Sequence, residues 1–91
     1  LLDLAKLDAH HLTITPTPGN LSEFVQRMVL AFDEQARRKR IQLRLRSDLP
    51  QPFYWFDTDK VEKITNNLLS NALKFTLDGG QVDVLLSAQA T

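Results

Sequence analysis

Residues 59–80 (DKVEKITNNLLSNALKFTLDGG) most constrain this chain, because they predict one long helix with two different faces. Apolar side chains recur there at spacings of three and four, which is typical of a helix that packs one side against a core. The members of this apolar stripe are Val61, Ile64, Leu68, Leu69, Ala72 and Phe75. A second, polar stripe lies within roughly 80° of arc and holds Lys60, Lys63, Asn67, Asn71 and Lys74.

The polar stripe combines two amides with three cations, a mixture that is not needed to fill a core. An Asn amide offers a neutral oxygen to a hard cation such as Mg²⁺, and a Lys ammonium offers a point charge to phosphate oxygens. The pattern therefore favours a helix that holds a metal ion and a polyphosphate while its apolar side packs on a sheet. A solvated helix face without a ligand is the alternative that the residue types leave open.

The string NNLLSNALKFT, residues 66–76, resembles the N-box of sensor histidine kinases, which reads roughly N-L-L-x-N-A-x-K-F/Y-T before a Gly pair. The preceding DTDKVEKI, residues 57–64, is similar to the family's approach to that helix. The same nucleotide-binding fold occurs in type II topoisomerases, mismatch-repair ATPases and a heat-shock chaperone. The K-F-T ending resembles the kinase branch.

This resemblance implies roles for five residues. Asn71 matches the Asn that coordinates the Mg²⁺ bridging the ATP phosphates, and Asn67 matches the position that faces the phosphates and a metal-bound water. Lys74 matches the cation that contacts the phosphate chain, and Phe75 the aromatic residue near the ribose and phosphates. Lys63 stands where the family more often has Gln. The implied cofactors are therefore ATP and Mg²⁺.

Composition narrows the class of protein further. The chain has 91 residues, which allows one small domain. Its formal net charge is zero, so no overall basic field would attract nucleic acid. Cys is absent, which excludes disulfides and Cys-based zinc sites, and no apolar run approaches the length of a membrane span. The missing initiator Met suggests a piece of a longer protein.

The start of the chain predicts two elements. Residues 1–10 (LLDLAKLDAH) suggest the end of an amphipathic helix, and they resemble the close of the second dimerisation helix of histidine kinases. Leu12–Thr17 alternates and is rich in β-branched residues, which predicts a short strand. We therefore divide the chain into a dimerisation-helix end, 1–10, and a truncated ATP-binding domain, 11–91.

The remaining elements predict an α/β (α+β) fold. Asn20 and Glu23 form a capping-box-like start to a helix that should run to about residue 40 and bury Leu21, Phe24, Val25, Met28, Val29 and Phe32. Strands are expected at 41–46, 53–56 and 81–87, and Asp57 should cap the N-box helix. Helices on one face of a mixed sheet make a two-layer sandwich, similar to the first half of the histidine-kinase-type ATPase fold.

Parts of the family pattern are absent. The chain lacks the adenine-binding D-x-G-x-G motif, the later Gly-rich segments and a phosphoacceptor His followed by Glu or Asp and then Pro. His10 and His11 are read as surface histidines at an element boundary. We expect the chain alone to be catalytically inactive, with weak or absent ATP affinity, because phosphate contacts from one exposed helix must offset the cost of binding.

Two functions follow. The first is a fragment of a two-component sensor histidine kinase whose ATP-binding domain transfers the γ-phosphoryl group to a His. This reading implies a cytoplasmic domain whose partners are ATP, the dimerisation and phosphoacceptor domain, and a response regulator. The alternative is a non-catalytic interaction or dimerisation module derived from the same fold. A strand at Gln81–Ser87 with a bare edge would favour homo-oligomers.

A nucleic-acid binder is the third reading, and we do not expect it. It would rest on the basic residues of 37–46 and on the aromatic residues of 53–56. In a strand, alternate residues must point inward, so at most half of these aromatic side chains are free to stack on bases.

Overall fold

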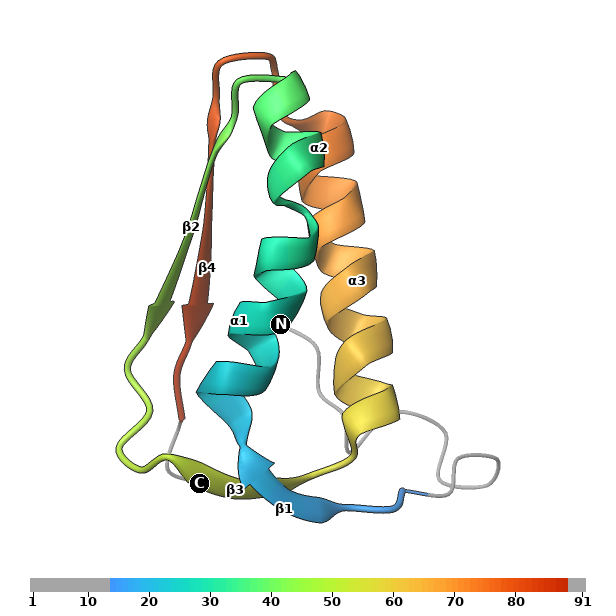
Figure 1. Ribbon diagram of the computed structural model, residues 1–91, viewed down its shortest axis with the longest axis vertical. Coiled ribbons are helices and arrows are strands. Elements are labelled where there is room, and N and C mark those ends of the chain that lie inside the picture. The colour runs from blue at the N-terminus through green and yellow to red at the C-terminus, as the bar shows by residue number, and fades with distance from the viewer. Residues whose placement is uncertain (1–13, 89–91) are drawn as a thin grey trace.

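The computed structural model describes residues 14–88, which fold into a helical layer, a sheet beside it and a small ribbon at one end (Figure 1). The predicted helix over residues 1–10 lies outside the described residues. The elements in chain order are β1 (Thr17–Asn20), α1 (Leu21–Ala31), α2 (Asp33–Arg38), β2 (Gln42–Ser47), β3 (Phe53–Phe56), α3 (Thr58–Phe75) and β4 (Gln81–Leu86).

The strands of the described residues form two pairs. β2 and β4 are parallel, in a register that runs from Gln42 opposite Gln81 to Ser47 opposite Leu86. β1 and β3 are antiparallel and lie across the ends of the helices where α1 and α3 begin (Figure 1). The predicted α/β class and the helical layer on one face are therefore confirmed, and the parallel and antiparallel pairings occur in separate small sheets.

The core lies between the helices and the inner face of β2 and β4. Val25 and Val29 of α1 and Leu69 of α3 form one buried cluster. Ala36, Ile41 and Leu73 form a second cluster toward the other end of the helices. Alternating strand residues complete both clusters, as the period of two in a half-buried strand requires. These strand residues are Leu43, Leu45, Val82, Val84 and Leu86.

Two predicted element boundaries are wrong. The strand expected at Leu12–Thr17 instead begins at Thr17, because the pairing partner β3 meets residues 17–20. Pro18 is tolerated there because, among the described residues, β1 pairs with β3 alone. The helix expected to reach residue 40 breaks at Phe32, whose N–H donates to the Val29 carbonyl three residues back (3.0 Å), and α2 then ends at Arg38.

The apolar stripe of α3 is also only partly buried. Leu69 is buried as expected, but Leu68 is 59% exposed and Phe75 is 74% exposed. Leu73, which the stripe did not include, is fully buried against Ala36 and Ile41. The reason is that α3 is covered on two sides, by α1 and α2 and by the sheet, so the buried face is rotated toward α2.

Arg40 occupies a left-handed backbone conformation, with φ of 53°. It follows the end of α2, where Ile41 N–H donates to the Ala36 carbonyl (2.9 Å) and Arg40 N–H donates to the Arg37 carbonyl (2.9 Å). This pattern resembles the helix termination in which Gly usually supplies the left-handed residue. Any residue with a Cβ is strained there.

We therefore expect Arg40→Gly to raise the free energy of unfolding by about 1 kcal/mol. Urea denaturation followed by circular dichroism would measure the change. Arg40→Ala is the matched control and should give no such gain, because Ala keeps the Cβ. An equal gain in both variants would show that the side chain of Arg40, rather than its backbone conformation, is unfavourable.

Candidate functional site

The N-terminal end of α3 is fixed by Asp57. Its carboxylate accepts hydrogen bonds from Thr15 N–H (2.8 Å) and from Lys60 N–H (3.2 Å), so Asp57 caps the helix as the sequence predicts. The hydrogen bond from Thr15 N–H, followed by that from Lys60 N–H, lowers the pKa of Asp57 below its ordinary value. This cap sets where α3 starts.

The structure places the predicted ligand residues on the outward face of α3. Lys63, Asn67, Asn71 and Lys74 are all exposed, whereas Leu69 and Leu73 on the opposite face anchor the helix in the core. The spacing of three and four residues between successive members brings them into one column along the helix surface. The column has two amide groups and two ammonium groups and is open to solvent.

Phe75 lies beside this column rather than in the core. Its ring centre is 5.4 Å from the Nζ of Lys74, a distance at which a cation and an aromatic face attract each other. The structure therefore brings Lys74 and Phe75 together at the end of the helix, with the aromatic ring mostly exposed.

The C-terminal end of α3 includes one contact that the sequence did not reveal. Lys39 Nζ donates hydrogen bonds to the carbonyl oxygens of Leu73 (2.6 Å), Thr76 (2.8 Å) and Lys74 (3.3 Å). In the sequence, Lys39 reads as part of a solvated cationic helix end. No local signal shows that its side chain crosses to a helix that begins nearly twenty residues later in the chain.

An apolar groove of about 460 Å³ runs between α3 and β4. Its lining includes Leu68 and Ala72 of α3 and Val84 and Leu86 of β4. Among the described residues, β4 pairs with β2 alone, so the groove lies next to an unpaired strand edge.

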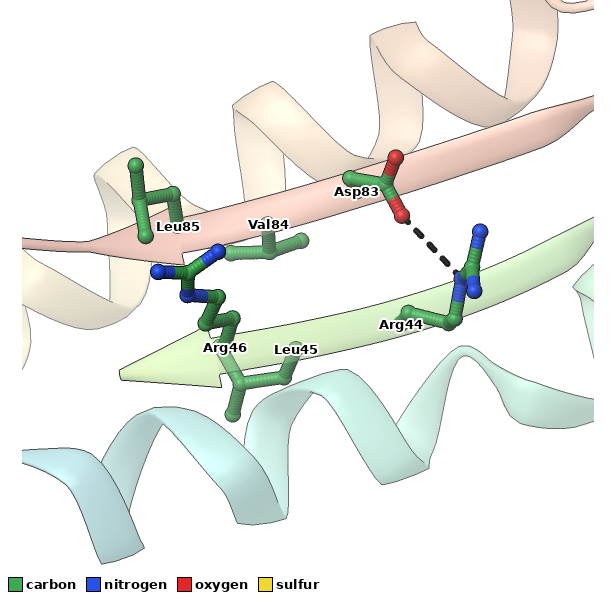
Figure 2. Close-up of a pocket in the computed structure, with 6 residues that line it drawn as sticks. All are labelled: Arg44, Leu45, Arg46, Asp83, Val84 and Leu85. Atoms are coloured by element: carbon green, nitrogen blue, oxygen red, sulfur yellow. Dashed lines mark ion pairs between the residues drawn. The ribbon is translucent and has the colours of Figure 1, made fainter. Parts of the chain in front are cut away.

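The face of β2 and β4 that points away from the helices carries three charged side chains beside the exposed Leu85, namely Arg44, Arg46 and Asp83 (Figure 2). Arg44 Nε lies 3.3 Å from the carboxylate of Asp83 on the neighbouring strand, with both side chains exposed. Arg46 is similarly paired with Asp48 at 3.2 Å. Exposed pairs of this kind add little stability, but they neutralise basic residues on which a nucleic-acid surface would depend.

The aromatic strand β3 alternates as the sequence predicts. Phe53 and Trp55 are exposed, while Tyr54 and Phe56 are half-buried. None of the helices within residues 14–88 has the length and apolar character needed to cross a membrane.

Comparison with known proteins gives one consistent group of relatives. The chain is 41% identical over 88 residues to the sensor histidine kinase TmoS of Ectopseudomonas mendocina, a match that covers 96% of this chain and 9% of TmoS. It is 31% identical over 86 residues to hybrid signal transduction histidine kinase D of Dictyostelium discoideum, covering 94% of this chain and 6% of that relative. No protein-family profile matches the chain.

Solved structures give the same fold. The catalytic domain of the histidine kinase ThkA superposes with a TM-score of 0.71 at 22% identity, covering 78% of this chain and 49% of that domain. ThkA has also been solved in complex with the response regulator protein TrrA. The chain thus spans about half of the catalytic domain it resembles and less than a tenth of the sequence relatives named above.

Proposed function

Because this chain belongs to the histidine kinases, with which it shares a segment of their catalytic domain, we propose that it supplies the phosphate-binding half of an ATP site. The observation that carries the proposal is the column on α3. Asn67, Asn71 and Lys74 share one exposed face of a helix whose opposite face is anchored by Leu69 and Leu73. A rigid helix holds such groups at fixed spacing, which limits the entropy lost when a ligand binds.

The donor set of the column fits a magnesium–nucleotide. The amide oxygens of Asn67 and Asn71 are hard neutral donors, which would suit Mg²⁺ that also takes oxygen ligands from water and phosphate. Asn71 would be the metal ligand, and Asn67 would lie one turn away toward a metal-bound water. Lys74 would contact phosphate oxygens, Phe75 would lie near the ribose, and Lys63 would extend the positive charge along the column. Bound Mg²⁺ would offset negative charge on the phosphates.

In the parent protein this half-site would serve transfer of the γ-phosphoryl group of ATP to a His. Positioning and charge stabilisation supply most of the catalysis in such reactions. The proposed division is a dimerisation-helix end at 1–10 followed by ATP-binding sequence at 11–91. The proposed partners are the dimerisation and phosphoacceptor domain and a response regulator, the second supported by the ThkA–TrrA complex. The chain by itself should not catalyse the transfer.

Titration of a magnesium complex of a non-hydrolysable ATP analogue, followed by heteronuclear NMR, tests the site. Weak binding, with a Kd on the order of 1 mM, should shift the signals of Asn67, Asn71 and Lys74. Asn71→Ala should abolish these shifts because it removes the metal ligand. Asn66→Ala is the matched control, since Asn66 is an exposed Asn of the same helix outside the column. Equal effects of the two variants, or a silent titration of the folded protein, would contradict the proposal.

A second proposal concerns self-association, and it is favoured by the edge of β4 that pairs with no strand within residues 14–88. The edge adjoins the apolar groove, and Leu85 of β4 and Leu68 of α3 are both more than half exposed. Apolar surface beside a free strand edge promotes pairing with a second copy of the chain. Analytical ultracentrifugation should detect dimers at high micromolar concentration. Leu85→Lys should shift the chain to monomer, whereas Arg46→Lys on the same sheet face should not. A strictly monomeric wild-type chain would refute self-association.

A further inference from the structure

Lys39 joins the ends of two helices that are far apart in the sequence. Its ammonium donates to three carbonyl oxygens at the end of α3, while its own carbonyl accepts a hydrogen bond from Gly79 N–H (2.8 Å). Lys39 N–H also donates to the Ala36 carbonyl (3.2 Å) at the end of α2. The residue is thus held from several directions, and its charge lies at a fixed place in the fold.

This place is electrostatically unusual. α2 and α3 run side by side in the same direction, so their C-terminal ends lie at the same end of the molecule (Figure 1). Each helix has a partial negative charge at its C-terminal end, where the last carbonyl groups lack intrahelical partners. Two parallel helices therefore place two negative ends next to each other.

The same end carries the proposed phosphate ligands. Asn71 and Lys74 lie in the last turns of α3, which ends at Phe75. Anions are normally bound at the N-terminal ends of helices, where the partial charge is positive. A phosphate chain at this C-terminal end would meet an unfavourable potential unless a cation neutralises it.

We propose that Lys39 is a positioning residue that makes this end of the molecule compatible with an anion. Its ammonium donates hydrogen bonds to the carbonyl oxygens of Leu73, Lys74 and Thr76 and offsets the partial negative charge of the adjoining helix ends. The ammonium of Lys74 is then available to phosphate. This inference rests on the proposed function of the α3 column. It assigns Lys39 a role through Lys74 and Asn71 and no contact with the ligand itself.

The test compares Lys39→Met with Arg37→Met and Lys39→Arg. The first variant removes the charge that contacts α3, and the second removes an equal charge from an exposed residue of α2 that pairs with Asp33 (3.0 Å). Lys39→Arg keeps the charge. Relaxation enhancement by small cationic and anionic nitroxides measures the local potential at the backbone amides of residues 71–76 without any bound ligand. Titration of each variant with the magnesium–ATP analogue then measures the affinity for the nucleotide.

We expect Lys39→Met to raise the ratio of cationic to anionic relaxation enhancement at these amides by about twofold or more. The same variant should also weaken the binding of the analogue by about fivefold to tenfold. Lys39→Arg should restore both quantities, and Arg37→Met should leave both nearly unchanged. A merely structural role of Lys39 would lower stability without weakening the binding of the analogue to the folded protein.

Two outcomes would overturn the inference. One is an equal change of potential in Lys39→Met and Arg37→Met. The other is a strongly negative potential at residues 74–76 in the wild-type chain, a result that needs no folded variant. A silent nucleotide titration together with the expected change of potential would refute the proposed ATP site and leave the charge compensation by Lys39 intact. Lys39→Gln, which keeps a donor without charge, replaces Lys39→Met if that variant does not fold.

Discussion

Leu73→Ala should lower the free energy of unfolding by about 3 kcal/mol. Leu73 is fully buried and packs against Ala36 and Ile41, so truncation leaves a cavity between α3, the end of α2 and the start of β2. A chain of this size has a total stability on the order of 5–10 kcal/mol. The variant should therefore lose a large part of its free energy of unfolding. Urea denaturation followed by circular dichroism would measure this loss.

Leu68→Ala is the matched control for this prediction. It makes the same chemical change in the same helix at a side chain that is 59% exposed. The loss in free energy of unfolding should stay below about 1 kcal/mol, because this side chain buries little apolar surface in the folded protein. If the two variants were equally destabilised, the orientation of α3 about its axis would differ from that described above.

Gly80→Ala should lower the free energy of unfolding by about 2 kcal/mol, the second largest loss that we expect. A Cβ at position 80 would lie 2.7 Å from Thr76 Cγ2 and 2.9 Å from the Leu77 carbonyl oxygen. Thr76 cannot easily rotate away, because its hydroxyl donates to the Ala72 carbonyl (2.6 Å). Thermal unfolding of the single variant would measure the cost.

A double-mutant cycle separates this clash from other effects. Thr76→Ser removes the methyl group and keeps the hydroxyl, so it should relieve about 1 kcal/mol of the cost of Gly80→Ala. The rest of the destabilisation should remain, because the Cβ would still lie too close to the Leu77 carbonyl oxygen. Strict additivity of the two changes would show that the methyl group of Thr76 is not the obstacle.

Much of the fold was predictable because the signals are local. Asn20 and Asp57 were identified as helix caps, and the structure confirms both through hydrogen bonds within three residues. The strands 42–47, 53–56 and 81–86 were predicted within one residue of their observed ends, since alternation of apolar residues is read directly from the chain. The relation to histidine kinases was likewise carried by consecutive residues of the N-box.

Other features depended on contacts between distant segments. The start of β1 was misplaced because its position is set by pairing with β3, more than thirty residues later. The burial of Leu73 follows from its packing against Ala36 of α2, which periodicity within one helix does not specify. An apolar stripe shows that a helix has a buried side, but the neighbouring elements decide how far that side is rotated.

The sequence alone determined that Asn67, Asn71 and Lys74 share one face of a helix, because helical spacing fixes which residues share a face regardless of what the helix packs against. Only the tertiary structure decided that the column ends where two parallel helices terminate, and that Lys39 reaches those termini. The physical reason is that side-chain spacing is a property of one element. The field at the end of an element depends on the charges and dipoles that the whole fold brings beside it.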